Sequence, residues 1–245
     1  MTVKAPKSVS FNSSAFCPGC GHGVVARLVG EVMEEMGLTD KLLTVVDVAC
    51  SSLNIDSWTF DTIISAHGRP IPTATGVKRV RKDNPVLAYL GDGAAYSIGI
   101  SETMYAGIRN DNVVAIVVNN GVFGMTGGQM APTSLEGQRT STSVKGRDIS
   151  KTGKPFDVVS VMKDIDMAYL ARGSVSNPKE IRATKKYIIK DFEKQMNNEG
   201  FALIEILSGC PTNLGISPVQ ANDRIDEVVS SYYETGEYID KGGKQ

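Results

Sequence analysis

Short apolar runs alternate with amphipathic stretches along most of this chain. The apolar runs predict strands at residues 42–48, 86–90, 113–118, 167–171 and 201–207. Between and before them, apolar side chains spaced three and four residues apart predict a helix over residues 22–36, and further helix-like stretches lie at 74–82, 97–109, 156–163 and 178–198. Apolar strands that alternate with helices are typical of a parallel sheet covered on both faces. We therefore expect an α/β fold, a doubly wound parallel sheet in one domain of residues 1–245, with its ligand at the carboxyl ends of the strands.

Three stretches depart from this alternation. Residues 120–155 have little periodicity and are rich in Gly, Thr and Ser, and a loop of that length inside a compact domain is usually functional. Residues 221–245 form a polar tail with a predicted helix at 228–233, which we expect to contact a partner. Residues 1–14 have no apolar core, so they predict a polar leader rather than a signal peptide.

The composition excludes several classes of function. A net charge of −1 argues against a nucleic-acid surface or a membrane-binding face. The single basic run, at residues 78–82, is interpreted as a solvated helix face. Because no run approaches the ~18 apolar residues that span a bilayer, we expect no membrane partner and a cytoplasmic protein whose thiols stay reduced.

Four cysteines are the first candidates for chemistry. Cys17 and Cys20 form a Cys-Pro-Gly-Cys turn, Cys50 follows a predicted strand, and Cys210 follows the last one. Four thiolates can hold a [4Fe–4S] cluster or a tetrahedral zinc ion. The pattern favours the cluster, because zinc modules usually carry two close cysteine pairs. A zinc site, a dithiol of Cys17 and Cys20 alone, and unrelated core cysteines all stay open.

A second motif consists of Gly91-Asp92-Gly93 and Asn119-Asn120. Each part follows a predicted strand, and Asn120 comes 28 residues after Asp92, which is the crossover length of a β-α-β unit. The two glycines let the backbone turn and approach a ligand closely. A carboxylate and an amide oxygen suit Mg²⁺ held together with phosphate groups. The spacing therefore predicts a diphosphate–Mg²⁺ site, with a plain surface turn as the alternative.

These residues resemble a known family. The aspartate and asparagine spacing is similar to the thiamine diphosphate motif, and the longer strings resemble the β subunits of 2-oxoacid:ferredoxin oxidoreductases. The strings are Phe16-Cys17-Pro18-Gly19-Cys20-Gly21, His67-Gly68-Arg69 with Ala74-Thr75-Gly76 after it, Asn119-Asn120-Gly121-Val122-Phe123-Gly124-Met125-Thr126-Gly127-Gly128-Gln129, and Cys210-Pro211-Thr212-Asn213.

The resemblance implies a thiamine diphosphate-binding fold and a role for each motif. Mg²⁺ would be bound by the side chains of Asp92 and Asn120 and the carbonyl of Val122. Thiamine diphosphate would be lined at its diphosphate by Gly91, Gly93, Ala94, Gly124, Met125 and Thr126, and near its thiazolium ring by Ser51, Ser52 and His67. His67 is also the candidate catalytic residue. Cys17, Cys20, Cys50 and Cys210 would ligate one [4Fe–4S] cluster.

The resemblance also implies an activity and partners. It implies the oxidative decarboxylation of a 2-oxoacid with coenzyme A to acyl-CoA and CO₂, with single electrons passing through the cluster to ferredoxin. A separate α subunit would bind the pyrimidine and supply the activating glutamate, and γ and δ subunits are further candidates. The substrate is open, with 2-oxoglutarate and branched-chain 2-oxoacids favoured over pyruvate. The alternatives are a non-redox thiamine diphosphate-dependent decarboxylase subunit and a zinc-stabilised nucleotide-binding module.

Overall fold

A seven-stranded sheet forms the centre of the computed structural model, which describes residues 5–10 and 14–242. Along the sheet the strands follow the order β2-β1-β3-β4-β8-β7-β9, and all neighbours pair in parallel except β7 and β9. The strands are β1 (Leu43–Asp47), β2 (Asp61–Ser65), β3 (Val86–Gly91), β4 (Val114–Asn119), β7 (Tyr169–Ser174), β8 (Ala202–Leu207) and β9 (Gly236–Asp240). The predicted doubly wound α/β fold is confirmed, although neither edge strand, β2 or β9, was predicted.

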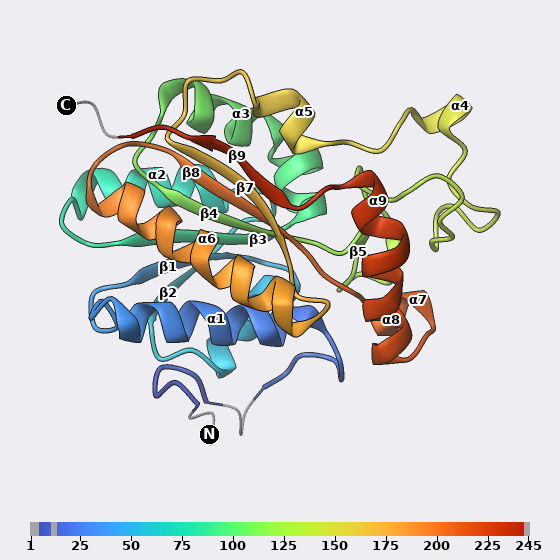
Figure 1. Ribbon diagram of the computed structural model, residues 1–245, viewed down its shortest axis with the longest axis horizontal. Coiled ribbons are helices and arrows are strands. Elements are labelled where there is room, and N and C mark those ends of the chain that lie inside the picture. Colours follow the sequence, from blue (N-terminus) through green and yellow to red (C-terminus); the bar gives the residue numbers. More distant parts are fainter. Residues whose placement is uncertain (1–4, 11–13, 243–245) are drawn as a thin grey trace.

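Helices cover both faces of the sheet (Figure 1). The two longest helices, α1 (Gly21–Glu35) and α6 (Pro178–Met196), pack over one face of the sheet and enclose one core cluster against it. On the other face, a second cluster contains side chains of α2 (Pro70–Val80), α3 (Ile100–Arg109) and α5 (Val158–Met162). Because the central strands are covered on both faces, all six residues of β4 are buried.

The short elements lie mainly at the carboxyl edge of the sheet. They are η2 (Cys50–Asp56), η3 (Ala94–Ile98), β5 (Val122–Phe123), β6 (Gln129–Met130), α4 (Ile149–Thr152), α7 (Pro211–Leu214), α8 (Pro218–Arg224), η4 (Ile225–Val229) and α9 (Ser230–Tyr232). Within the predicted irregular stretch, β5 and β6 form a small antiparallel hairpin. The segment around α4 then projects away from the body of the domain (Figure 1).

The two ends of the chain are built into the domain where the structure describes them. The predicted polar leader lies partly outside the described residues, but Val9 is buried and bridges to Trp58. The predicted helix at 228–233 is found in η4 and α9, and β9 then pairs with β7. Residues 243–245 of the expected partner-contacting tail lie outside the described residues. Among the described helices, none has the length and apolar character needed to cross a membrane.

The basic run at the end of α2 is not uniformly solvated, so its interpretation as a solvated face is wrong for Lys78. That side chain is buried, and its Nζ donates to the carbonyl oxygens of Lys82 at 2.8 Å and Asn84 at 2.7 Å. Arg79 and Lys82 are exposed as expected. The aliphatic stem of a lysine can be buried when its ammonium finds acceptors, and here backbone carbonyls supply them.

Asp191 in α6 provides a test of how buried charge affects this fold. It is fully buried, and neither carboxyl oxygen has a hydrogen-bond partner among the described residues. Burial raises its pKa well above the ordinary value. A raised acid pKa means that the folded chain binds more protons than the unfolded chain, so stability falls as the pH rises above the unfolded value of about 3.9.

We therefore expect Asp191→Asn, which keeps the shape and removes the charge, to be more stable than the wild type at pH 8. The gain in stability should be smaller at pH 5, because the cost of keeping the Asp191 carboxyl protonated in the folded chain grows as the pH rises. Thermal melts at both pH values measure the difference, with Glu193→Gln, exposed on the same helix, as the control. A variant less stable than the wild type at pH 8 would contradict this account.

Candidate functional site

The parallel strands end at a common edge of the sheet. The register pairs Val46 with Tyr89, Gly91 with Val118, and Asn119 with Leu207. The ends of three adjoining strands consequently carry the candidate residues: Asp47 at the end of β1, Asp92 after β3 and the asparagines at the end of β4. The chain also runs from β1 outward to β2 and returns to β3 on the opposite side of β1, and such a reversal of strand order is where doubly wound folds bind ligands.

A narrow pocket of about 30 Å³, the central pocket, lies at this edge. Most of the predicted cofactor and metal residues line it: Cys50, Ser51, His67, Gly91, Asp92, Gly93, Ala94, Asn120, Val122, Gly124 and Met125. The pocket has room for only a few water molecules, so it does not by itself enclose a molecule of cofactor size. One wall is tight because Gly93 lies against Phe123, whose ring would be 2.4 Å from a Cβ at that position.

Two of the residues predicted to line thiamine diphosphate, Ser52 and Thr126, do not line this pocket. Ser52 donates its hydroxyl to the carbonyl of Ala49 at 2.8 Å, and exposed Thr126 donates its hydroxyl to Gln129 at 2.7 Å. In contrast, the hydroxyl of Ser51 is buried and has no hydrogen-bond partner among the described residues. Ser51 is therefore the serine that has a free polar group to offer a ligand in the central pocket.

Asp92 is a buried carboxylate without a cationic partner among the described residues. Its Oδ2 accepts hydrogen bonds from the hydroxyl of Thr133 and, at 3.2 Å, from the backbone N–H of Gly121. Burial raises the pKa of this carboxyl to about 7, even though these hydrogen bonds act in the opposite direction. A divalent cation would offset the burial of this charge, so the donor set here fits Mg²⁺.

The two asparagines after β4 have different surroundings. Asn119 is buried, donating through Nδ2 to Glu205 at 3.0 Å and accepting from the N–H of Gly121 at 3.2 Å. Asn120 accepts from the N–H of Val122 at 3.2 Å and lines the central pocket. Asn119 therefore holds the turn in shape, and Asn120 is the one placed to meet a ligand.

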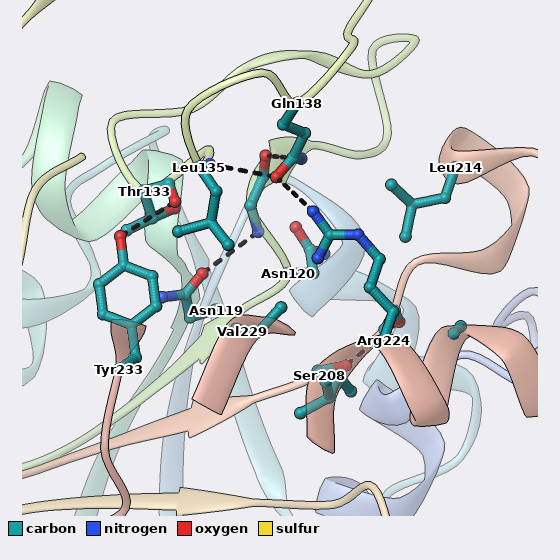
Figure 2. A pocket seen from close by; sticks show the side chains of 14 residues that line it. Asn119, Asn120, Thr133, Leu135, Gln138, Ser208, Leu214, Arg224, Val229 and Tyr233 are labelled. Carbon is teal, nitrogen blue, oxygen red and sulfur yellow. Dashed lines mark hydrogen bonds between the residues drawn. The ribbon is translucent and has the colours of Figure 1, made fainter. Parts of the chain in front are cut away.

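A second small cavity, of about 20 Å³, lies behind this turn (Figure 2). In it the carbonyl of Gly121 accepts hydrogen bonds from Ser134 at 2.6 Å and from Gln138 at 2.9 Å. Arg224 donates to Gln138 at 3.3 Å, and Tyr233 donates to the carbonyl of Thr133 at 3.0 Å. The irregular stretch after β5 thus braces the asparagine turn from behind.

A buried ion network supports Asn119. The Nε of Arg172 donates to Glu205, and its Nη2 donates to Asp157 at 2.5 Å. Arg172 and Glu205 are 2% and 0% exposed, so neither charge is compensated by water. The guanidinium also lies 4.9 Å from the ring centroid of Tyr233. Glu205 is therefore paired with a cation, whereas Asp92 has no cationic partner in the described part of the chain.

His67 is held by a partner that the sequence analysis did not identify. Its Nδ1 lies 2.6 Å from Oδ2 of buried Asp47, whose Oδ1 accepts from the N–H of Gly68 at 2.7 Å. Because an ionised carboxylate only accepts, it places the hydrogen of His67 on Nδ1 and leaves Nε2 for other partners. Burial raises the pKa of the Asp47 carboxyl, against these hydrogen bonds.

The four cysteines surround a separate, larger space, which we term the cysteine cavity. All four thiols are free and line one cavity of about 390 Å³. Local structure presents them: Cys20 and Cys210 precede the first turns of α1 and α7, and Cys50 begins η2. Within the described chain, no group of three or more Cys, His, Asp or Glu side chains is arranged for a single metal ion.

The thiols influence one another across this cavity. Burial raises the pKa of Cys20 to about 12, and the nearby Cys210, Cys50 and Cys17 act in the same direction. Burial likewise raises the pKa of Cys50 to about 11. Cys20 and Cys50, two thiols that resist ionisation in a cavity lined by all four, fit a site that becomes stable when a polynuclear cationic centre neutralises them.

The cysteine cavity and the central pocket share a wall. Cys50, Asn120, Gly124 and Met125 line both spaces. Sequence reasoning grouped these residues into separate motifs, and it missed Asp47 and Thr133, which orient His67 and Asp92. Asp47 could have been found, since it is the one charged residue of the apolar run predicted as a strand at residues 42–48. Thr133 carries no such signal, because it lies in the irregular stretch.

Comparison with known proteins identifies the family. The family described as "Thiamine pyrophosphate enzyme, C-terminal TPP binding domain" matches residues 45–206. Ketoisovalerate oxidoreductase subunit VorA of Methanothermobacter thermautotrophicus is 34% identical over 200 residues, which cover 81% of this chain and 42% of the relative. The 2-oxoglutarate synthase subunit KorB of Archaeoglobus fulgidus is 32% identical over 212 residues, covering 86% of this chain and 75% of the relative.

The chain therefore spans less than half the length of the VorA relative. Its fold is also similar to a solved structure of 2-oxoglutarate:ferredoxin oxidoreductase from Magnetococcus marinus with 2-oxoglutarate, coenzyme A and succinyl-CoA bound. The TM-score is 0.80 at 24% sequence identity, covering 100% of this chain and 88% of the other. At that identity, the likeness establishes the fold alone.

The buried network behind Asn119 leads to a stability prediction. Arg172→Met leaves the buried carboxylate of Glu205 without its cation, so we expect a loss of about 3–5 kcal/mol in the free energy of unfolding. Adding Glu205→Gln should restore part of it. Lys190→Met, which removes the more exposed pairs to Glu237 and Asp240, should cost no more than about 1 kcal/mol. Urea denaturation measures all three, and equal losses for Arg172→Met and Lys190→Met would refute the role of the network.

Proposed function

This chain belongs to the thiamine pyrophosphate enzymes, with their C-terminal TPP-binding domain, and from that premise we propose that it is the thiamine diphosphate-binding subunit of a 2-oxoacid:ferredoxin oxidoreductase. The observation that carries the proposal is the shared wall between the cysteine cavity and the central pocket. A thiamine enzyme without an electron acceptor needs no such cavity. A cluster there would lie directly beside the cofactor.

The residues of the central pocket fit a metal-bound diphosphate. Asp92 and Asn120 would bind Mg²⁺ by their side chains and Val122 by its carbonyl, which gives the hard oxygen ligands that this ion prefers. Gly91, Gly93, Ala94, Gly124, Met125 and Thr126 would line the diphosphate, with Thr126 contributing backbone because its hydroxyl is bonded to Gln129. Ser51, Ser52 and His67 would lie nearer the thiazolium ring.

The cysteine cavity fits a polynuclear centre. Cys17, Cys20, Cys50 and Cys210 would ligate one [4Fe–4S] cluster, which needs four thiolates around a space larger than a single ion. When bound, thiamine diphosphate stabilises the carbanion left by decarboxylation, and the cluster accepts electrons singly. This combination suits oxidation of a 2-oxoacid with coenzyme A to acyl-CoA and CO₂, with ferredoxin as the acceptor.

His67 and Asp47 would orient the substrate. Asp47 holds the ring of His67 through Nδ1, so Nε2 remains free for a polar contact to the reacting carboxylate or the cofactor. The buried carboxylate thus fixes both the tautomer and the direction of the imidazole. In the neutral imidazole, the hydrogen is therefore held on Nδ1.

A partner subunit would complete the site. The central pocket is too small for the whole cofactor, and a single sheet provides only the diphosphate-binding half. An α subunit would bind the pyrimidine and supply the activating glutamate, with γ and δ subunits as further components, and the chain alone would be inactive. Residues 1–245 would act as one cofactor-binding domain of a cytoplasmic complex, with its N-terminal cysteine segment at the cluster and its C-terminal tail against the partner.

The relatives named for ketoisovalerate and 2-oxoglutarate favour those two classes of 2-oxoacid.

Metal analysis tests the proposal. The chain, purified without oxygen together with its native partners, should contain about four irons and matching sulfide per chain. One zinc and no iron would refute the electron-transfer function and leave a non-redox thiamine enzyme.

Cys50→Ser should separate electron transfer from cofactor binding. Loss of one thiolate should reduce ferredoxin reduction by the complex to roughly a hundredth or less, because the cluster is lost or altered. The affinity for thiamine diphosphate should stay within about threefold by titration calorimetry. Ser57→Ala, at the other end of the same helix, is the control. Ferredoxin reduction at the wild-type rate in Cys50→Ser would rule out the cluster assignment.

Asp92→Asn should weaken Mg²⁺-dependent binding of thiamine diphosphate. The amide lacks the negative charge that attracts the ion, and we expect a loss of affinity of about 10–100-fold or more. Calorimetric titration with and without Mg²⁺ measures it, and exposed Asp83→Asn, at the opposite edge of the sheet, is the matched control. Unchanged affinity in Asp92→Asn would remove Asp92 from the metal site.

A further inference from the structure

One side chain links the cysteine cavity to the loop of the central pocket. Asn213 lies in α7, three residues after Cys210. Its Nδ2 donates to the Sγ of Cys210 at 3.2 Å and to the carbonyl of Gly124 at 3.1 Å. An amide nitrogen has two hydrogens, and these two acceptors use both of them. Asn213 thus joins a proposed cluster ligand to the backbone of the proposed diphosphate loop.

Asn213 also packs closely against the loop at Gly128. A Cβ at Gly128, which has a φ of +75°, would lie 2.6 Å from Oδ1 of Asn213. The backbone of this loop therefore comes so close to the amide that only glycine fits there. Asn213 therefore packs against the loop at Gly128 in addition to its hydrogen bonds to Gly124 and Cys210.

The same loop also contacts a second cysteine. The backbone N–H of Met125 hydrogen-bonds to the thiol of Cys50, opposing the effect of burial on its pKa. A Cβ on Gly124 would lie 3.3 Å from that sulfur. Gly124 and Met125 both line the central pocket. They lie beside Cys50, and Gly124 is also joined to Cys210 through Asn213.

Hydrogen bonds to ligand sulfurs change the electron affinity of an iron–sulfur cluster. An N–H donor withdraws charge from the thiolate and stabilises the reduced, more negative cluster. We propose that Asn213 is a positioning residue that raises the reduction potential of the cluster through Cys210 and couples that potential to the thiamine-binding loop through Gly124. The inference rests on the proposed function, because it requires the cluster.

The coupling has a reciprocal consequence. If binding of Mg²⁺ and thiamine diphosphate moves or stiffens the loop at Gly124, it changes the hydrogen bond to Cys210 as well. Cofactor binding then shifts the reduction potential, and reduction shifts cofactor affinity by the same free energy. Electron uptake becomes sensitive to whether the neighbouring pocket is filled.

The test compares Asn213→Asp and Asn213→Ala in the anaerobically purified complex. Asp keeps the shape of Asn but replaces the donor by a negative acceptor, and Ala removes both hydrogen bonds. Redox titration followed by electron paramagnetic resonance measures the midpoint potential with and without Mg²⁺ and thiamine diphosphate. Thr212→Val is the matched control, because Thr212 also lines the cavity but its hydroxyl makes no hydrogen bond among the described residues.

We expect the equilibrium constant for one-electron reduction to fall about tenfold in Asn213→Asp, a lowering of about 59 mV, and about threefold in Asn213→Ala. The shift caused by the cofactor should be at least halved in both, and Thr212→Val should match the wild type. If Asn213→Ala fails to assemble the cluster, Asn213→Asp decides the outcome. Wild-type potentials in an iron-loaded variant would overturn this inference and leave the proposed function standing. Absence of iron from the wild-type complex would instead refute the proposed function.

Discussion

The parallel register of the central strands is the constraint on which the other features depend. Since β1, β3, β4 and β8 pair in parallel over nearly equal lengths, their carboxyl ends stop at one edge, and the residues after them meet there. The strand interiors are apolar on both faces, and each face packs into its own core cluster. A one-residue shift of register would turn every side chain to the other face and disrupt the packing of both clusters. Burial of the sheet therefore also fixes the distances between Asp47, Asp92 and Asn120.

The partners of the buried carboxylates distinguish those that support the fold from the one that is placed to bind a ligand. Glu205 has the guanidinium of Arg172, and Asp47 has His67 and the N–H of Gly68. Asp92 is as deeply buried but, among the residues that the structure describes, has only neutral donors, and burial raises its pKa to about 7. A negative charge without compensation at the end of a strand is unfavourable unless a cation binds. The unpaired carboxylate is thus the part of the pocket that most clearly requires a ligand.

The loop after β4 serves both proposed cofactors. Its first residues present Asn120 and Val122 to the central pocket, and its next residues contact the surroundings of Cys50 and Cys210. The stretch that follows braces the turn from behind through hydrogen bonds to the carbonyl of Gly121. Electron transfer between two centres requires that they stay close, and one short loop held on both sides meets that requirement.

The sequence alone determined the α/β fold, the strand runs in the interior of the sheet and the motifs, because apolar periodicity and glycine, cysteine and carboxylate spacing are local properties. It missed β2 and β9, since edge strands are half-exposed and lack a continuous apolar run. Only the tertiary structure showed that Asn119 supports the turn through Glu205 and Gly121, that Asp47 orients His67, and that Asn213 joins two sites. Those roles depend on side chains brought together from distant segments, and no local pattern records such contacts.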